Sequence, residues 1–436
     1  MTAQVKHADD CRSGHGSPQE FEDLESAVRV YCRSFDVIFT KALGCHVYDQ
    51  NGLRYIDFLA GAGALSYGHN DPWIKKAVVD YLQADGILSS LDLHTAAKLA
   101  FLRKFNEVIL APRGLDYRVQ FCGPTGANAI EAALKLARKT TGRTTVVAFT
   151  NAFHGASLGA LAVTANAKMR AVAGVMLDGV VRMPFDGFPG AGDDSIAFLD
   201  GMLAAGSGIE NPAAIVVETI QAEGGIHVAS DGWLRRLAEL ARQRGILLIL
   251  DDIQAGCGRS GTFFSFERAG IVPDMVCLSK AIGGIGMPMS LTLIRPGLDL
   301  WQPGEHNGTF RGNNLGFVAA AAALDYWREP GFEEAIERRG NLMRASLDAT
   351  AARHPHGYVA VRGRGMIQGI VCADPRWTSE IQRRAFKRGL IVETCGPRDE
   401  VVKLLPPLNI PEDLLEEGLS ILSKTADEVA MESMRN

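Results

Sequence analysis

Between residues 118 and 294, short uninterrupted aliphatic runs alternate with segments long enough to form helices. A strand that is apolar on both faces is typical of a parallel sheet covered by helices on each side. The pattern therefore predicts an α/β domain built on a buried, mostly parallel sheet. Ligands of such sheets bind beyond the carboxyl ends of the strands, so the polar residues that follow the runs are the candidate site residues. The runs are residues 119–122, 145–149, 214–217, 246–250, 276–278 and 291–294.

The 436 residues are enough for about two to three domains. We expect residues 76–320 to form the large domain and residues 321–436 to form a smaller α+β domain. Residues 21–75 are predicted to join that smaller domain. Residues 1–20 are polar, contain no apolar run and predict a disordered leader.

Two local signals fall in the N-terminal segment. Apolar residues at helical spacing predict a short helix over residues 21–35. Asn51–Gly52 lies between two strand-like runs and predicts the turn of a β-hairpin.

Composition excludes several classes of protein. Lysine and arginine total 45 against 50 aspartates and glutamates, so no basic excess exists to bind nucleic acid. No apolar run approaches the ~18 residues that a membrane span requires. The eight cysteines are scattered without a C-x-x-C pair, which favours a reducing cytoplasm over a disulfide framework. The histidines show no metal-ligand spacing, so we expect no metal site.

A glycine-rich turn, residues 123–128, separates a predicted strand from a predicted helix. The free N–H groups at the start of a helix, together with its dipole, suit a phosphate. Thr125 adds a hydroxyl donor to this turn. A plain strand-to-helix turn is the alternative interpretation.

Two further strand ends carry ionisable side chains. The run 246–250 ends in Asp251 and Asp252. A carboxylate there would keep a neighbouring ring nitrogen protonated, although a metal ligand or a helix N-cap would also place an aspartate at this point. Lys280 follows the run 276–278. A desolvated lysine can attack a carbonyl to form a Schiff base, and a surface lysine with a buried stem is the alternative.

Together these three features are the parts needed to hold pyridoxal 5′-phosphate. The glycine-rich turn would take the phosphate, Asp251 would pair with the pyridinium nitrogen and Lys280 would bind the aldehyde carbon. Phe153, in the segment 151–155, adds an aromatic ring that could stack on the cofactor.

At this point the chain resembles the class III aminotransferases, which have the fold of type I pyridoxal-phosphate enzymes. The resemblance extends from about residue 21 to 425, and its motifs occur in the family's order. It implies a large domain with a mostly parallel sheet and a smaller α+β domain. The motifs are Val47-Tyr-Asp-x-x-Gly-x-x-Tyr-Ile-Asp57, Gly68-His69, Thr125-Gly-Ala127, Phe153-His-Gly155, Val217–Gly225, Asp251-Asp-Ile-Gln254, Ser279-Lys280 and His306–Asn313.

The resemblance implies a role for each matching residue. Lys280 would be the Schiff-base lysine and proton carrier, and Asp251 would pair with the ring nitrogen. Thr309 would reach the phosphate of a neighbouring subunit, which implies a homodimer. The remaining residues implied to hold the cofactor are Thr125, Gly126, Ala127, Phe153, His154, Glu218 and Gln254.

More closely, the chain is similar to the diaminobutyrate–2-oxoglutarate transaminases of ectoine and siderophore pathways. Such enzymes move an amino group by ping-pong chemistry between L-glutamate/2-oxoglutarate and L-aspartate 4-semialdehyde/L-2,4-diaminobutyrate. The segments that carry this similarity are residues 24–35, 60–69, 112–117 and 303–314.

The resemblance also implies a device for accepting two different amines. In many class III enzymes a glutamate and an arginine pair while the ω-amine is bound and separate when the glutamate α-carboxylate needs the arginine. Glu223 occupies the position of that glutamate, but Lys403 stands where the arginine is usual. A lysine cannot form the bidentate fork of an arginine. Arg311 is the second candidate for binding the carboxylate, with an ion pair at a subunit interface as its alternative role.

Two other functions remain open from the sequence. Another ω-transaminase, acting on ornithine, 4-aminobutyrate or a polyamine, or a pyridoxal-phosphate racemase would share these motifs. A non-catalytic binding subunit of the same fold would be expected to lack Lys280 or Asp251, and both are present.

Overall fold

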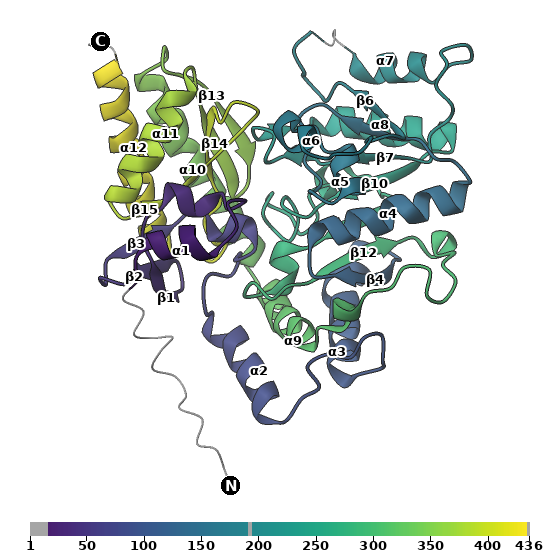
Figure 1. The fold of residues 1–436 in the computed structure, drawn as a ribbon, viewed down its shortest axis with the longest axis horizontal. Coiled ribbons are helices and arrows are strands. Elements are labelled where there is room, and N and C mark those ends of the chain that lie inside the picture. The colour runs from purple at the N-terminus through teal and green to yellow at the C-terminus, as the bar shows by residue number, and fades with distance from the viewer. Residues whose placement is uncertain (1–15, 191–193, 434–436) are drawn as a thin grey trace.

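The structure, a computed structural model, describes residues 16–190 and 194–433. Two bodies lie side by side, and each is built on its own sheet (Figure 1). The larger body contains a seven-stranded sheet. In spatial order its strands are β4 (Arg118–Gly123), β12 (Ser290–Ile294), β11 (Met275–Leu278), β10 (Leu247–Asp251), β7 (Ala214–Val217), β5 (Val146–Phe149) and β6 (Val180–Met183).

The predicted mostly parallel sheet is confirmed, with one exception. Strands β11, β10, β7, β5 and β6 run parallel to one another in turn. Strand β12, formed by the run 291–294, is antiparallel to both β11 and β4. Only residues 279–289 separate β11 from β12. Because a parallel pair needs a crossover of a dozen or more residues, this connection returns the chain in the opposite direction.

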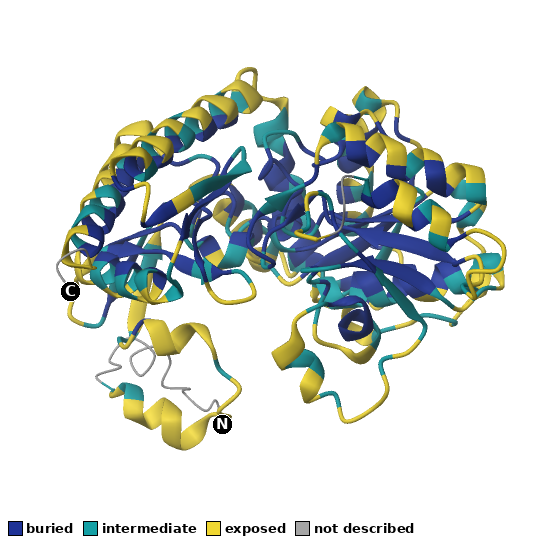
Figure 2. Cartoon of the chain, turned by 90° about the horizontal axis from the view of Figure 1, so that it is seen from above, coloured by how far each residue is buried: buried dark blue, intermediate teal, exposed yellow. Residues whose placement is uncertain are grey.

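Both faces of the large sheet are buried, as the continuous aliphatic runs predict (Figure 2). Along β7, Ile215 and Val217 face one hydrophobic core and Ala214 and Val216 face the other, because side chains alternate across a strand. The helices of this body are α3 (Ala96–Phe105), α4 (Gly126–Thr141), α5 (Leu158–Val163), α6 (Ala167–Ala171), α7 (Ser195–Met202), α8 (Asp231–Arg244) and α9 (Asn314–Ala323).

The smaller body combines both ends of the chain. Its first sheet has the order β13 (Tyr358–Arg364), β14 (Ile367–Cys372), β17 (Val401–Leu404), β16 (Glu393–Cys395). A second sheet has the order β1 (Phe39–Leu43), β2 (His46–Asp49), β3 (Arg54–Asp57), β15 (Leu390–Ile391). The helices α10 (Phe332–Arg353), α11 (Pro375–Lys387) and α12 (Glu412–Ser433) pack on them (Figure 1). Strand β3 pairs in parallel with β15, so residues from opposite ends of the sequence share one sheet.

The predicted hairpin is present, because β2 and β3 are antiparallel and Gly52 has a φ of 80° in the turn between them. The prediction of one helix over residues 21–35 is wrong. Helix α1 (Pro18–Leu24) ends at Leu24, and a separate 3₁₀ turn covers Tyr31–Ser34. No residue of either element is buried, so no packing stabilises a longer helix.

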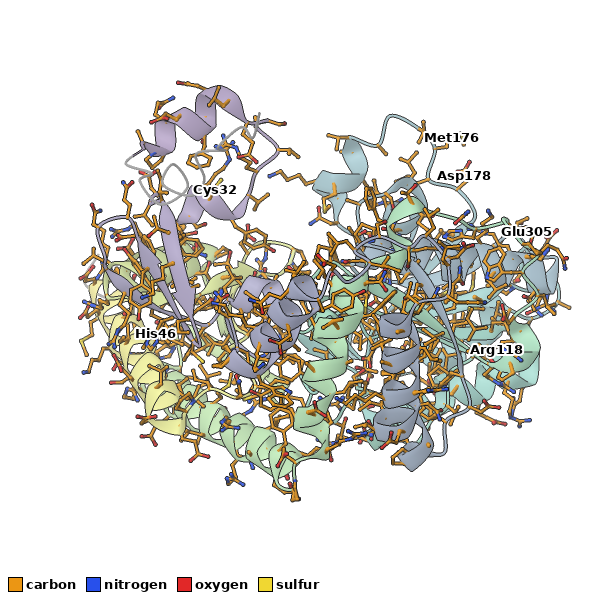
Figure 3. The ribbon with its side chains drawn as sticks, turned by 90° about the horizontal axis from the view of Figure 1, so that it is seen from below. Cys32, His46, Arg118, Met176, Asp178 and Glu305 are labelled. Atoms are coloured by element: carbon orange, nitrogen blue, oxygen red, sulfur yellow. The ribbon has the colours of Figure 1, made fainter. Side chains whose placement is uncertain are left out.

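The segment 16–35 forms an arm beside the smaller body, and Figure 3 shows Cys32 on it. The predicted leader, residues 1–20, lies mostly outside the described residues, and α1 begins within its last part at Pro18. Helix α2 (Pro72–Gln83) packs on α9 of the larger body. No helix in the described part of the chain is long and apolar enough to cross a membrane.

Candidate active site

A cavity of about 580 Å³, measured out to the open solvent, lies at the carboxyl ends of the parallel strands. Asp251 ends β10, Glu218 follows β7 and Lys280 follows β11 by two residues. Parallel strands bring these three ends to the same edge of the sheet, as expected from the strand pattern. The predicted site residues that line the cavity are Gly126, Ala127, Phe153, His154, Glu218, Glu223, Asp251, Gln254 and Lys280.

Asp251 is held rigidly at the base of the cavity. Its side chain is about 5% exposed. The Oδ2 atom lies 2.7 Å from Nδ1 of His154, and Oδ1 accepts a 3.0 Å hydrogen bond from the N–H of Ile253. The backbone N–H of His154 donates to the Thr164 hydroxyl at 2.9 Å, which fixes the imidazole in turn. The imidazole Nε2 is buried without a partner among the described residues.

Lys280 reaches the same cavity from the carboxyl end of the neighbouring parallel strand, β11. Its backbone has a φ of 52°, in the left-handed region that non-glycine residues rarely adopt. Its Nζ makes no hydrogen bond or ion pair with any residue that the structure describes. Burial lowers the pKa of this amine, and the negative charge of Glu223 opposes that shift. An unpartnered amine with a lowered pKa is suited to nucleophilic attack.

Glu218 closes the rear of the cavity. Its Oε2 accepts a 3.0 Å hydrogen bond from the N–H of Phe153, which places the segment carrying that ring. Burial, and then the charge of Asp251, raise the pKa of Glu218 well above its usual value. A raised pKa favours the protonated carboxyl of Glu218, which in that form can donate a hydrogen bond into the cavity.

The glycine-rich turn forms the start of α4. Thr125 is the N-cap residue, and both its N–H and its hydroxyl donate to Asn128 Oδ1, at 3.2 and 3.0 Å. A Cβ atom on Gly126 would approach the Ile253 side chain to 2.9 Å, so a larger residue there would force Ile253 to shift. Gly126 and Ala127 line the cavity, and Thr125 lies at the exposed side of the turn. The N-terminus of this 16-residue helix therefore adjoins the cavity, and free N–H groups at a helix N-terminus are suited to bind an anion.

Glu223 and Lys403 form an ion pair where the two bodies meet. Lys403 Nζ donates to Glu223 Oε1 at 2.7 Å, and Gln254 Nε2 donates to the same oxygen at 3.1 Å. Burial alone would raise the pKa of Glu223, but the Lys403 and Lys280 charges hold it at about 2. The Lys403 side chain is fully buried, and the charges of Glu223 and Glu393 raise its pKa well above the usual value.

Glu393 is a member of this cluster that the sequence reasoning missed. Its Oε1 lies 3.1 Å from Lys403 Nζ. In the sequence, Glu393 directly follows three apolar residues, 390–392, which predict a buried strand. A charged side chain is rarely buried without a partner, so its position next to this run was the available signal.

Four predicted site residues do not line the cavity: Thr125 and Lys403, described above, and Thr309 and Arg311. Thr309 begins the 3₁₀ turn Thr309–Gly312 and is exposed. Arg311, in the same turn, forms an ion pair with Asp92 and donates to the His306 carbonyl at 3.3 Å. Within one chain, therefore, the structure does not bring Arg311 to Glu223. No cluster of three or more metal-ligating side chains occurs in residues 16–190 and 194–433.

Comparison with known proteins gives relatives along nearly the whole chain. The chain is 53% identical over 406 residues to a diaminobutyrate–2-oxoglutarate transaminase of Halalkalibacterium halodurans, covering 93% of this chain and 95% of that one. It is 54% identical over 411 residues to the protein of the same name from Nocardia farcinica, covering 94% of each. Among solved structures, a Toxoplasma gondii ornithine aminotransferase with partial pyridoxal-phosphate occupancy superimposes with a TM-score of 0.84 at 26% identity, covering 95% and 94%.

The match to a family model agrees with the geometry of the cavity. Residues 28–426 match the model described as aminotransferase class-III. This span contains both bodies and every residue placed in the cavity. The chain therefore belongs to the class III aminotransferase family.

Proposed function

We propose that this chain is a pyridoxal-phosphate-dependent transaminase that moves an amino group between L-glutamate/2-oxoglutarate and L-aspartate 4-semialdehyde/L-2,4-diaminobutyrate. The observation that carries the reaction class is the unpartnered Lys280 amine in one cavity with the buried Asp251. The names of the relatives that are 53% and 54% identical support the choice of substrates.

The cavity suits the cofactor on three structural grounds. An amine without a partner, a buried carboxylate and a helix N-terminus line the same space. Lys280 would hold the aldehyde carbon, Asp251 the ring nitrogen and the turn 125–127 the phosphate. Phe153 lines the cavity with an aromatic face for the ring. When bound, pyridoxal phosphate supplies an electron sink that stabilises a carbanion beside the reacting nitrogen.

Lys280 would also move a proton. Its lowered pKa leaves Nζ able to take a proton from the substrate carbon and return it at another atom. Gln254 keeps Glu223 near this amine, because its Nε2 donates both to Glu223 and, at 2.8 Å, to the Ala62 carbonyl.

The enzyme must accept two amines that differ beside the reacting carbon. Glutamate carries a carboxylate there, whereas diaminobutyrate reacting at its terminal amine carries only hydrogens. The closed Glu223–Lys403 pair presents no free cation, which suits diaminobutyrate. A glutamate α-carboxylate would take the place of Glu223 against Lys403 through a single charged hydrogen bond.

A homodimer would complete the site. Thr309 lies outside the cavity of its own chain, and the neighbouring Phe310 is 69% exposed. The segment 88–93, joined to the Thr309 turn by the Arg311–Asp92 ion pair, exposes the further apolar side chains Leu88, Leu91 and Leu93. A large exposed apolar surface is typical of a subunit interface.

Light scattering on the holoenzyme tests the homodimer. The measured mass should be twice the 46.9 kDa chain mass or a multiple of that value, and the mass of a monomer would refute the dimer.

The substrate assignment is tested in single half-reactions. Purified holoenzyme, without a keto acid, is mixed separately with L-2,4-diaminobutyrate, glutamate, ornithine and 4-aminobutyrate. We expect diaminobutyrate and glutamate to convert the cofactor, followed by absorbance, at least about tenfold faster than the other two amines. Faster conversion by ornithine or 4-aminobutyrate would leave the reaction class intact and refute these substrates.

The same assay separates the two amines in Glu223→Ala. This change removes the carboxylate that neutralises Lys403 while diaminobutyrate is bound. The ratio of the two half-reaction rates should therefore shift toward glutamate by about tenfold. Equal losses on both amines would show that Glu223 does not distinguish them.

A further inference from the structure

Lys403 contacts two carboxylates, although one would suffice for an ion pair. Glu393 and Lys403 are directly opposite each other on the antiparallel strands β16 and β17. This register fixes Glu393 Oε1 3.1 Å from Lys403 Nζ, on a side chain that is only about 4% exposed. Burying a second carboxylate against one ammonium is costly, since the cluster then carries a net negative charge. That cost calls for a functional explanation.

The two carboxylates differ in their access to substrate. Glu223 lines the cavity and its side chain is 27% exposed, whereas Glu393 lies behind Lys403 in the small-domain sheet. A lysine ammonium has three N–H donors, so Lys403 can bind Glu393 and one further acceptor in front of it at the same time. When Glu223 is displaced, the Glu393 carboxylate would therefore still hold Lys403 in place.

We propose that Glu393 is a positioning residue that holds Lys403 while the α-carboxylate of glutamate or 2-oxoglutarate displaces Glu223, and that Glu393 binds a proton from solvent in the same event. The inference rests on the proposed function, because it needs a substrate that brings a carboxylate to Lys403.

The charges around Glu393 favour this proton uptake. Burial raises the pKa of Glu393 to about 7, Lys403 opposes the shift and Glu223 adds to it. The substrate carboxylate takes the place of the Glu223 carboxylate against Lys403, and the displaced Glu223 stays in the cavity. More negative charge then lies near Glu393, so its pKa is higher in the complex than in the free enzyme. Dicarboxylate affinity is then greatest below pH 7 and declines as the pH rises through 7.

The other titratable groups that face Glu393 do not change charge in this range. Partial desolvation raises the pKa of the Tyr31 phenol, although the residue is 48% exposed, and burial raises that of the Cys395 thiol, so both stay neutral. While it is paired with Lys403, Glu223 has a pKa of about 2 and is ionised, and the comparison with Glu393→Gln separates proton uptake by Glu393 from proton uptake by a displaced Glu223. Lys280 is attached to the cofactor in the holoenzyme. Glu393 is therefore the group in this cluster that titrates near neutral pH.

Calorimetry on the holoenzyme tests the proposal without turnover. The probe is 2-oxoglutarate without an amino donor, titrated at pH 7.5 in two buffers of different ionisation enthalpy. Wild type should take up about 0.7 proton per subunit more than Glu393→Gln, because a group of pKa 7 is mostly ionised at that pH. The wild-type dissociation constant should rise about tenfold from pH 6 to pH 8. In Glu393→Gln it should stay within about twofold of the wild-type value at pH 6.

Glu400→Gln is the matched control, because Glu400 is a buried glutamate beside the same sheet whose Oε2 accepts from the Arg398 N–H. It should retain the wild-type proton uptake. The Michaelis constant for diaminobutyrate should change less than about twofold in Glu393→Gln. Equal proton uptake in wild type and Glu393→Gln would overturn the inference.

A shorter acid gives a second test should the glutamine variant fail to fold. Glu393→Asp withdraws the carboxylate from Lys403, so the affinity for 2-oxoglutarate should fall about tenfold while the Michaelis constant for diaminobutyrate is retained. Parallel losses on both would indicate a purely structural role. Failure of wild type to convert diaminobutyrate would instead refute the substrate assignment, and the proton uptake on 2-oxoglutarate would still report on Glu393.

Discussion

Lys280→Ala is expected to abolish transamination, with a loss of about 10⁴-fold in turnover. The lysine Nζ is the unpartnered amine at the carboxyl end of β11, and burial keeps its pKa below the usual value. Both proposed roles, holding the cofactor and moving the substrate proton, depend on this nitrogen. Alanine removes the nitrogen without adding bulk to the cavity.

Two measurements check this prediction. Steady-state assays with diaminobutyrate and 2-oxoglutarate give the turnover. Borohydride reduction followed by peptide mass spectrometry should attach the cofactor to Lys280 in wild type and to no peptide in the variant. Lys424→Ala, an exposed lysine on α12, is the control and should keep both activity and labelling. Wild-type turnover by Lys280→Ala would refute the assignment of the central residue.

Asp251→Asn should reduce the rate of both half-reactions by about 10² to 10⁴-fold. Asparagine keeps the size of the side chain and its hydrogen bond from the Ile253 N–H. It loses the negative charge that holds a ring nitrogen protonated, so the electron sink is weakened. The rate of cofactor conversion in rapid mixing experiments measures this effect directly.

The neighbouring Asp252 offers a closely matched control. It is buried as deeply as Asp251, but its Oδ2 accepts from the Ser265 N–H and it does not line the cavity. Burial raises the pKa of Asp252 to about 7, so near neutral pH asparagine there removes only part of a negative charge. Asp252→Asn should lower the rates by less than about tenfold. Equal effects of the two substitutions would mean that packing, not the Asp251 charge, explains the loss.

The sequence predicted the large sheet because its signal is local. A strand buried on both faces must be apolar at every position, and the runs that end at Asp251 and before Lys280 meet that condition. The parallel order of those strands then placed the two side chains at one edge. The antiparallel direction of β12 was missed, because the aliphatic run 291–294 looks the same in either direction.

Features that depend on strand register or on tertiary burial were not predicted. Glu393 faces Lys403 only because β16 and β17 pair in one register, and a slip of one residue would turn the side chain to the other face. The apolar spacing over residues 21–35 met the pattern for a helix, but the arm has no core to cover it. Sequence periodicity shows that a helix would carry its apolar residues on one face. It does not show whether another part of the protein covers that face.

The pairing of β3 with β15 has a consequence during synthesis of the protein. Residues 54–57 leave the ribosome long before residues 390–391. The edge of β3 that later pairs with β15 therefore stays unpaired while the whole large domain is translated. The large domain has no such dependence on the last segment and can form its seven-stranded sheet first. Completion of the smaller body is therefore a late event, and until then an open strand edge is available to chaperones or to other nascent chains.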